Sequence, residues 1–240
     1  MHDLTDRQLV ILKHIIDEYI NTAEAVGSST LEKKYPNLGV SPATIRNEMA
    51  DLTKMGYLKQ LHTSAGRVPT PEALKFYVNR LMKLKDLSVT DEVGIKEKVM
   101  DNRQNFEKTL RQATKELAMR TRELAISTDN QGNIFYSGTA NILDMPEFFD
   151  IDLTKTVLTL LDEFDFLNEI FAHSQNEPGI HILLGSDFGA EYLESCGLVF
   201  TSFGHGKNSG VIGVMGPYRR NYPVVIPTVQ YFGNVLNEMY

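Results

Sequence analysis

Apolar residues recur at helical spacing through the first part of the chain and predict a run of short helices. The first should cover residues 5–20, because one apolar stripe runs along it, formed by Leu9, Leu12, Ile15, Ile16 and Tyr19. Thr5 and Gln8 have the spacing of a capping box at its start. A second helix should cover about residues 28–35, and the sequence at 36–39 predicts a turn.

The third predicted helix, at residues 41–55, has clear start and stop signals. Ser41 is a suitable N-cap, Pro42 takes the first helical position, and Gly56 favours the end of the helix. Its inward face should consist of Ile45, Met49 and Leu52. The outward face then consists of Thr44, Arg46, Asn47, Ala50, Asp51 and Lys54.

A hairpin and a fourth helix follow. Residues 57–61 read as a strand, 62–67 as a short polar loop and 68–70 as a proline-limited edge strand, before a helix over about 72–85. Two helices joined by a turn and followed by a hairpin are the order of a winged helix-turn-helix. The pattern therefore predicts a DNA-binding domain over residues 1–85.

The middle of the chain predicts a connector and one long helix. Residues 86–94 are polar, and about 95–126 carry a sparse apolar stripe made of Val99, Phe106, Leu110, Ala113, Leu117 and Leu124. We expect residues 86–127 to be a linker and long dimerisation helix that also lies near phosphates. The alternative for its charged residues is an ordinary solvated helix face.

The last part, residues 128–240, predicts an α+β domain. Short strands are expected at 134–137, 180–184, 197–203 and 210–215, with amphipathic helices at about 153–172 and 224–239. This alternation favours a small, mostly antiparallel sheet with helices packed on it. The start of the last helix is open, because Pro223 and Pro227 both restrict helix on their N-terminal side.

Composition and charge narrow the possible functions. Apolar residues make up 42% of the 240 residues and charged residues 23%, as in soluble globular proteins, and Cys196 is the one cysteine. No run approaches the roughly 18 apolar residues of a membrane span, so a cytoplasmic protein is expected. The net charge is −7, but residues 1–85 carry an excess of three positive charges. The basic excess thus coincides with the predicted DNA-binding domain.

The candidate DNA contacts lie on the third helix and in the loop of the hairpin. Arg can pair with guanine and Asn with adenine, so Arg46 and Asn47 are the best candidates to read bases. Further candidates are Ser41 (also the cap), Thr44 and Lys54 on the helix, and His62, Thr63, Ser64 and Arg67 in the loop. Arg67 could enter a minor groove or touch phosphate. The alternatives are solvent-facing helix residues and a plain hairpin turn.

Signatures of other chemistry are weak in this sequence. His173, His181 and His205 are the nearest approach to a metal-type grouping, and surface histidines explain them better. Gly204-His205-Gly206 lacks the Gly-Lys-Ser/Thr that a phosphate loop needs. Cys196 reads as a small buried side chain. We expect no catalytic site, no metal and no cofactor.

Long stretches of the sequence resemble one family. Residues 41–52 (SPATIRNEMADL) and 62–70 (HTSAGRVPT) are close to the recognition helix and wing of the heat-inducible transcription repressor HrcA family. Residues 138–143 (GTANIL) and 210–217 (GVIGVMGP) resemble its C-terminal half. The resemblance implies a winged helix, a GAF-like domain and an inserted dimerising domain.

The resemblance also implies a function. Members bind, as dimers, an inverted-repeat operator upstream of chaperone operons, and heat lowers their active fraction. The chaperonin GroEL helps to keep them active. By resemblance, this chain is expected to repress heat-shock operons rather than act as an enzyme. The alternative is a metabolite-responsive winged-helix regulator with a GAF-like ligand domain.

One departure from the family concerns the middle of the chain. Only a dozen residues separate Ala125 from Gly138, where the family has a substantial stretch. The inserted domain, and with it the first strands of the GAF-like domain, are expected to be missing. The truncated domain at 128–240 would then form the dimer through the helix at 95–126 and its own apolar surface.

Overall fold

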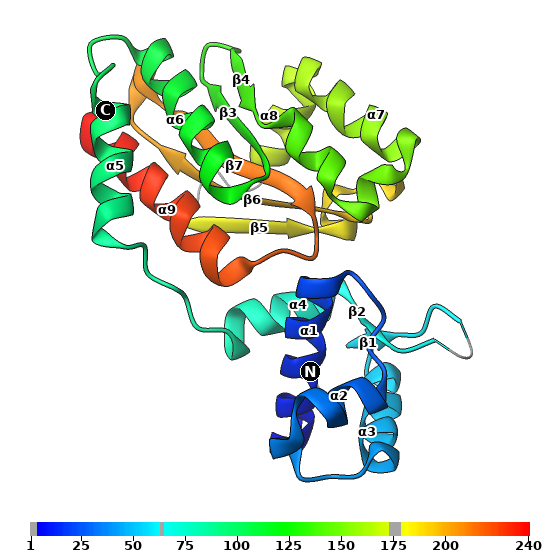
Figure 1. Ribbon diagram of the computed structural model, residues 1–240. Helices are drawn as coiled ribbons and strands as arrows, with labels where there is room; N and C mark the ends of the chain where they lie inside the picture. Colours follow the sequence, from blue (N-terminus) through cyan, green and yellow to red (C-terminus); the bar gives the residue numbers. More distant parts are fainter. Residues whose placement is uncertain (1–3, 63–64, 173–178) are drawn as a thin grey trace. The chain divides into compact units, whose positions relative to one another are not determined.

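The computed structural model describes residues 4–62, 65–172 and 179–240 (Figure 1). The chain divides into two compact units, Met1–Lys83 and Leu84–Tyr240. Both combine helices with antiparallel strands, so the α+β class expected from the sequence is confirmed.

The first unit contains the predicted order of elements. Its helices are α1 (Asp6–Thr22), α2 (Ser28–Lys34), α3 (Pro42–Lys54) and α4 (Pro71–Phe76), the last continued by a π-helical turn at Tyr77–Leu81. Strands β1 (Leu58–Lys59) and β2 (Val68–Pro69) pair antiparallel, with Leu58 opposite Pro69. The strands are shorter than predicted, and the fourth helix ends before residue 82 rather than at 85.

Apolar residues of α1 and α3 form the core of the first unit. Leu12, Ile15 and Ile16 on α1 and Ile45 and Leu52 on α3 are fully buried, as their spacing predicts. The predicted capping box is present, because the Thr5 hydroxyl accepts from Gln8 N–H and the Gln8 side chain accepts from Thr5 N–H.

Polar contacts join α1 to the end of α2. The imidazole of His14 stacks on Tyr35 with ring centroids 3.9 Å apart, and Lys34 Nζ lies 2.5 Å from Oε1 of the buried Glu18. Burial, assisted by Lys13, lowers the pKa of His14, although Asp17 opposes the shift. The stacked imidazole is therefore neutral at physiological pH, and α2 is fixed before the chain turns into α3.

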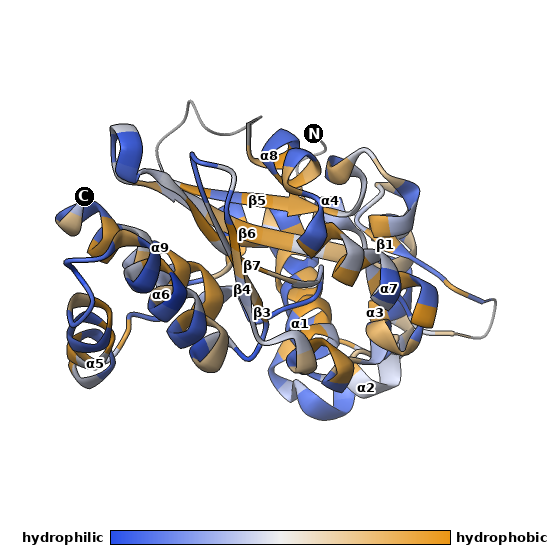
Figure 2. Ribbon diagram, turned by 90° about the horizontal axis from the view of Figure 1, so that it is seen from above, coloured by the Kyte–Doolittle hydropathy of each residue, from blue (hydrophilic) through white to orange (hydrophobic). Residues whose placement is uncertain are grey.

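The second unit is a five-stranded antiparallel sheet with helices on both faces. Its strands are β3 (Leu124–Asp129), β4 (Ile134–Ser137), β5 (Ile180–Leu184), β6 (Cys196–Phe203) and β7 (Gly210–Pro217), in the order β4-β3-β7-β6-β5. Its helices are α5 (Val89–Met100), α6 (Phe106–Thr121), α7 (Ile151–Thr159), α8 (Phe164–Ala172) and α9 (Tyr222–Met239). The central strands are hydrophobic along most of their length (Figure 2).

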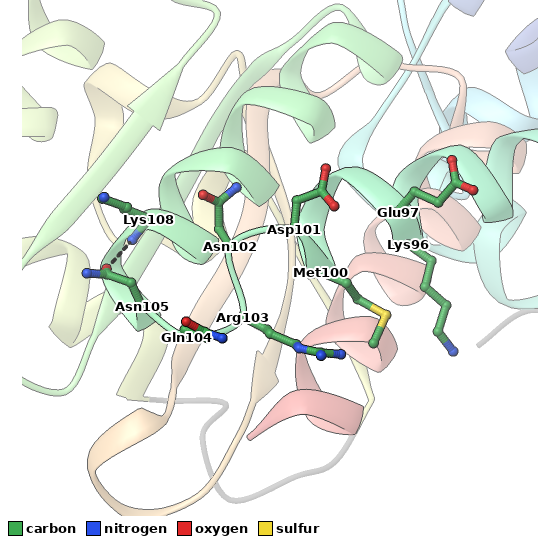
Figure 3. Close-up of a pocket in the computed structure, with 9 residues that line it drawn as sticks. All are labelled: Lys96, Glu97, Met100, Asp101, Asn102, Arg103, Gln104, Asn105 and Lys108. Atoms are coloured by element: carbon green, nitrogen blue, oxygen red, sulfur yellow. Dashed lines mark hydrogen bonds between the residues drawn. The ribbon is translucent and has the colours of Figure 1, made fainter.

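The prediction of a single long helix at 95–126 is wrong, because this segment forms two separate helices, α5 and α6. The chain turns at residues 101–105, where Asn105 N–H donates to Asn102 C=O at 2.9 Å. The Asn105 side chain caps α6 by accepting from Lys108 N–H at 2.9 Å (Figure 3). Asp and Asn are poor inside helices and good at turns and caps, so this polar stretch ends one helix and starts the next.

The predicted end of that helix, at residue 126, is also wrong, because α6 ends at Thr121. Leu124, counted in the helical stripe, is the first residue of β3, which pairs with both β4 and β7. Arg122 lies between helix and strand in the left-handed region at φ 54°. The helix predicted at 153–172 is likewise two helices, α7 and α8, separated by a 3₁₀ turn at Leu160–Asp162. In both places the apolar pattern continued while the chain changed direction.

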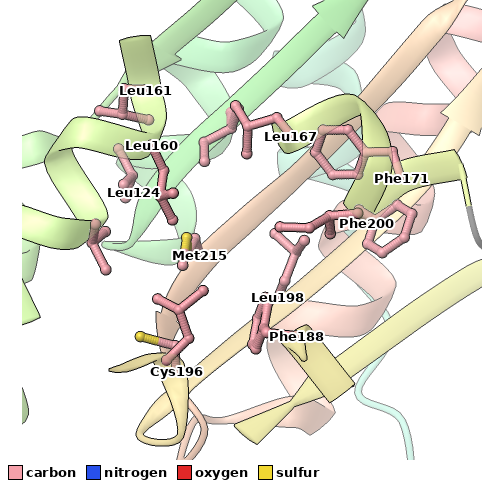
Figure 4. Packing of buried hydrophobic residues seen from close by; sticks show 14 of the residues in the cluster. Leu124, Leu160, Leu161, Leu167, Phe171, Phe188, Cys196, Leu198, Phe200 and Met215 are labelled. Atoms are coloured by element: carbon pink, nitrogen blue, oxygen red, sulfur yellow. The ribbon is translucent and has the colours of Figure 1, made fainter. Parts of the chain in front are cut away.

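One face of the sheet packs against α7 and α8. Its core includes Leu124 on β3, Leu198 and Phe200 on β6, and Met215 on β7, with Phe171 of α8 above Phe200 (Figure 4). Gly213 lies opposite Phe200 in the register, and a Cβ there would be 2.5 Å from the Phe200 Cβ. The missing side chain at 213 therefore lets the aromatic core close over the middle of the sheet.

The other face packs against α6 and α9. Thr114 of α6 and Ser127 of β3 are buried with their hydroxyl oxygens 2.6 Å apart. Gly233 of α9 lies so close to Thr201 of β6 that an added Cβ would be 2.4 Å from the threonine methyl group. Helix α6 is therefore part of the second unit's core, and its inner face is not free for a partner.

Pro227 lies inside α9, which begins at Tyr222. A proline has no N–H to donate, so the carbonyl of Pro223, four residues earlier, lacks its helical partner. The backbone N–H of Lys85 donates to this carbonyl at 2.9 Å. The segment that opens the second unit is thereby hydrogen-bonded to the first turn of its last helix.

A buried arginine joins the ends of β6, β7 and α9. Arg220 is 3% exposed and its guanidinium donates to the carbonyls of Gly197, Val214 and Pro217. Arg220 Nη1 also lies 3.0 Å from Oε2 of the buried Glu123. Burial raises the pKa of the Glu123 carboxyl, and the Arg220 charge opposes the rise.

Replacing this arginine should cost much stability. Arg220→Met would leave the buried Glu123 carboxyl without its ion-pair partner and remove the hydrogen bonds to three carbonyls, so we expect a loss of about 3–5 kcal/mol in the free energy of unfolding. The measurement is urea unfolding of the full chain. Arg103→Met, at an exposed arginine with no side-chain partner in the described part of the chain, is the control and should change it by less than about 0.5 kcal/mol. Equal effects of the two would contradict this role of Arg220.

Candidate nucleic-acid interface

The start of α3 is held by its cap. Ser41 Oγ accepts from Thr44 N–H at 3.2 Å and lies 3.1 Å from Thr44 Oγ1. Pro42 at the first helical position has no N–H that would need a partner. The two hydroxyls predicted to contact DNA therefore lie together at the positive end of the helix dipole, and one of them serves as the cap.

The outward face of α3 presents polar side chains to solvent. Arg46 and Asn47 are exposed, and neither side chain has a hydrogen-bond or ion-pair partner in residues 4–62, 65–172 and 179–240. Lys54 at the far end is 78% exposed and pairs with Asp51 at 3.0 Å. Arg7 of α1 reaches Glu48 on this face at 3.3 Å. The unpaired donors of α3 thus gather in its first turns.

The loop between β1 and β2 carries the remaining candidates. His62 is exposed, and its carbonyl accepts from Ala65 N–H at 2.9 Å. Thr63 and Ser64 lie outside the described residues. Lys59 and Gln60 of the first arm are exposed as well. The sequence pattern does not predict them as contacts, because nothing in it separates them from ordinary solvent-facing strand residues.

Arg67 has a different setting from the other candidates. Its side chain is partly buried, Nε donates to Thr53 Oγ1 at 3.1 Å, and Nη1 donates to Ala65 C=O at 3.5 Å. The guanidinium therefore connects the base of the loop with the last turn of α3. Sequence reasoning gave no hint of the Thr53 contact, since the two residues belong to different elements.

Concave surfaces in the second unit are open and polar. One of about 830 Å³ lies at the α5–α6 turn (Figure 3). Lys96 there already pairs with Glu238 at 2.6 Å. Another of about 470 Å³ is lined partly by Ser88, Asp91 and Arg120. The arginine there pairs with the aspartate at 2.7 Å. The serine hydroxyl donates to the same aspartate at 2.6 Å and caps the start of α5.

Three other kinds of site bear on function: a reactive cysteine, a metal site and a membrane-spanning helix. Burial raises the pKa of the Cys196 thiol to about 12, so this cysteine is not a nucleophile at neutral pH. Within the described residues, no three His, Cys, Asp or Glu side chains are grouped to hold a metal. No helix in the same residues has the length and apolar character to cross a membrane.

Comparison with known proteins identifies the family. The family model of the HrcA protein C-terminal domain matches residues 67–226. The chain belongs to the HrcA family. Its curated relatives include the heat-inducible transcription repressor HrcA of Carboxydothermus hydrogenoformans, which is 29% identical, with 98% of each chain covered. The same-named protein of Clostridium acetobutylicum is 54% identical over 100 residues, which is 42% of this chain and 29% of that protein.

One solved structure shows a similar fold. The crystal structure of a hypothetical protein at 2.2 Å resolution is 19% identical, with a TM-score of 0.79 over 99% of this chain and 98% of that one. The match with the C. hydrogenoformans HrcA extends over 337 positions, whereas this chain has 240 residues. At least 97 positions of that alignment therefore have no residue of this chain, as expected for a shortened member.

The cap of α3 can be tested separately from DNA binding. Ser41→Ala removes the acceptor for Thr44 N–H and should lower the stability of the first unit by about 1 kcal/mol, whereas Ser41→Asn restores a cap and should lose little. Thermal unfolding of the full chain, followed by signals from the first unit, measures both. An equal loss from both substitutions would show that the Ser41 cap does not hold the start of the helix.

Proposed function

We propose that this chain represses heat-shock operons by binding an inverted-repeat operator as a dimer through its first unit. The observation that carries the proposal is the unpaired, exposed pair Arg46 and Asn47 at the start of α3. Bound repressor would block access of the polymerase to the promoter. Membership of the HrcA family, whose relatives are named heat-inducible transcription repressors, supports this function. A cytoplasmic protein, on the nucleoid when bound, is part of the proposal.

The first unit has the parts that a winged helix-turn-helix uses. Helices α2 and α3 are joined by a short turn, and the β1–β2 hairpin follows as the wing. In this assignment α3 enters the major groove and Arg46 and Asn47 reach base edges. Contacts to phosphate would come from Ser41, Thr44, Lys54 and His62, with Thr63 and Ser64 as further candidates at the tip of the wing.

The second unit is assigned regulation and dimerisation, as a truncated GAF-like domain. The shortened middle removes residues that relatives possess. The inner face of α6 packs against the sheet, so the dimer must form through another face of the second unit. Phe149 is 72% exposed and Ile151 61% exposed at the start of α7, and Tyr192 nearby in the fold is 54% exposed. This apolar group supports an isologous contact between two copies.

Heat would act through loss of the native second unit. For a small domain about 1 kcal/mol shifts the unfolding midpoint by about 4–8 °C, so modest stability gives a steep response over a few degrees. The proposal includes GroEL as the partner that restores active repressor, on family resemblance alone. The metabolite-responsive alternative gains no support from the two open, polar concavities.

Operator binding is the first test. Arg46→Ala should weaken binding to a duplex with the inverted repeat by about tenfold to a hundredfold, because a bidentate base contact contributes about 1–3 kcal/mol of discrimination. Fluorescence anisotropy compares this duplex with a scrambled one at several salt concentrations. Arg111→Ala, at a 64% exposed arginine of the second unit, is the charge-matched control and should stay within about twofold. Equal, weak binding of both duplexes by the unaltered protein would refute the proposal.

The dimer face has its own test. The double variant Phe149→Ser/Ile151→Ser should sediment as a monomer at micromolar concentration, where the unaltered protein is a dimer, because the contact loses its apolar centre. Val89→Ser, at a 75% exposed valine of α5, is the control and should remain dimeric. A monomer formed by Val89→Ser alone would move the interface to α5, and a monomeric unaltered protein would exclude the dimer.

A further inference from the structure

The side chain of Arg67 hydrogen-bonds the wing to α3. Arg67 Nε donates to Thr53 Oγ1 at 3.1 Å, and the same hydroxyl donates to Met49 C=O at 2.7 Å within the helix. The hydroxyl therefore uses its proton inside α3 and offers a lone pair to the arginine. This arrangement fixes the guanidinium relative to the helix axis.

The same guanidinium also holds the loop. Arg67 Nη1 donates to Ala65 C=O at 3.5 Å, and the Gln60 side chain donates to this carbonyl at 3.2 Å from the other arm. One arginine thus connects the last turn of α3 with the base of the wing loop. Without it, the described part of the loop would depend on the short two-stranded hairpin, which is weak by itself, for its position beside α3.

The backbone around Arg67 is anchored on the opposite side. Val26 N–H donates to Arg67 C=O at 2.9 Å and Arg67 N–H donates to Val26 C=O at 2.8 Å. Gly66 passes so close that a Cβ would be 2.4 Å from Val26 C=O. Residue 67 is therefore held by the α1–α2 connector through its backbone and by α3 through its side chain.

We propose that Arg67 is a positioning residue that sets the wing relative to the recognition helix, and does not itself contact DNA. The inference rests on the proposed function, since the wing matters only if α3 reads a duplex. Its physical basis is that the guanidinium of Arg67 is partly buried and hydrogen-bonded, whereas that of Arg46 is exposed and, in the described part of the chain, unpartnered. These bonds use Nε and one N–H of Nη1, so a swing of the side chain away from α3 toward a phosphate would break both.

Thr53→Val tests this without changing any charge. Valine has the shape of threonine but cannot accept from Arg67, so operator binding should weaken by about tenfold, the size of one coupling of about 1.4 kcal/mol. Arg67→Gln should weaken it by a similar factor. The double variant should be no weaker than either single one, because both remove the same contact. Thr53→Ser keeps the hydroxyl and should bind as the unaltered protein does.

Salt dependence separates positioning from contact. Each phosphate contact contributes about 0.9 to the slope of log K against log salt. Positioning predicts that Thr53→Val leaves this slope unchanged while affinity falls. Unchanged affinity in Thr53→Val, with Arg67→Gln lowering the slope by about one, would overturn the proposal and make Arg67 a phosphate contact.

Amide hydrogen exchange in the free protein distinguishes failure of the positioning role of Arg67 from failure of the proposed DNA-binding function. If Arg67 positions the wing, Thr53→Val should raise the exchange of the Val26 and Arg67 amides at least about tenfold and leave that of Ile15 in the core unchanged. Unchanged exchange at all three would overturn the positioning role. Absence of operator binding by the unaltered protein, with exchange raised as expected, would instead refute the proposed function and retain the coupling of the wing to α3.

Discussion

The second unit depends on the burial of one charged side chain. Arg220 occupies the space where β6 and β7 end and α9 begins, and it donates to the carbonyls of Gly197, Val214 and Pro217. A buried arginine is costly unless its donors are used, and here the backbone uses them. Glu123, just before β3, completes the cluster. Strands from both ends of the domain's sequence are thereby held to its last helix.

That last helix also holds the beginning of the domain. Pro227 leaves the Pro223 carbonyl without a helical donor, and Lys85, only two residues after the first unit, supplies one. The unpaired carbonyl of α9 is thus satisfied by the segment that directly follows the first unit. If α9 separated from the sheet, this segment would lose its anchor, which gives unfolding of the second unit a physical route to the connector.

Local signals were predictable from the sequence, whereas contacts between elements were not. The cap of α3 at Ser41, its buried face and most strands follow from spacing and propensity, and they are confirmed. The break at residues 101–105 was missed because the apolar stripe continues in phase through it, although Asn105 carries a cap signal. Strand β3 was missed because Leu124 fits that same stripe. Register and burial, which decide such cases, depend on residues far away in the chain.

The two arginines of the proposed interface show the same limit at the level of single side chains. Arg46 and Arg67 both lie in segments that resemble the recognition helix and wing of the family. The sequence alone therefore gives no reason to assign them different roles. In the fold the helix aims one into solvent, while Thr53 and Ala65 engage the other. An arginine that is already hydrogen-bonded has fewer donors to offer a phosphate, but it can define where its neighbours lie. Specificity in such a module then depends on the rigidity between helix and wing as well as on the residues that touch bases.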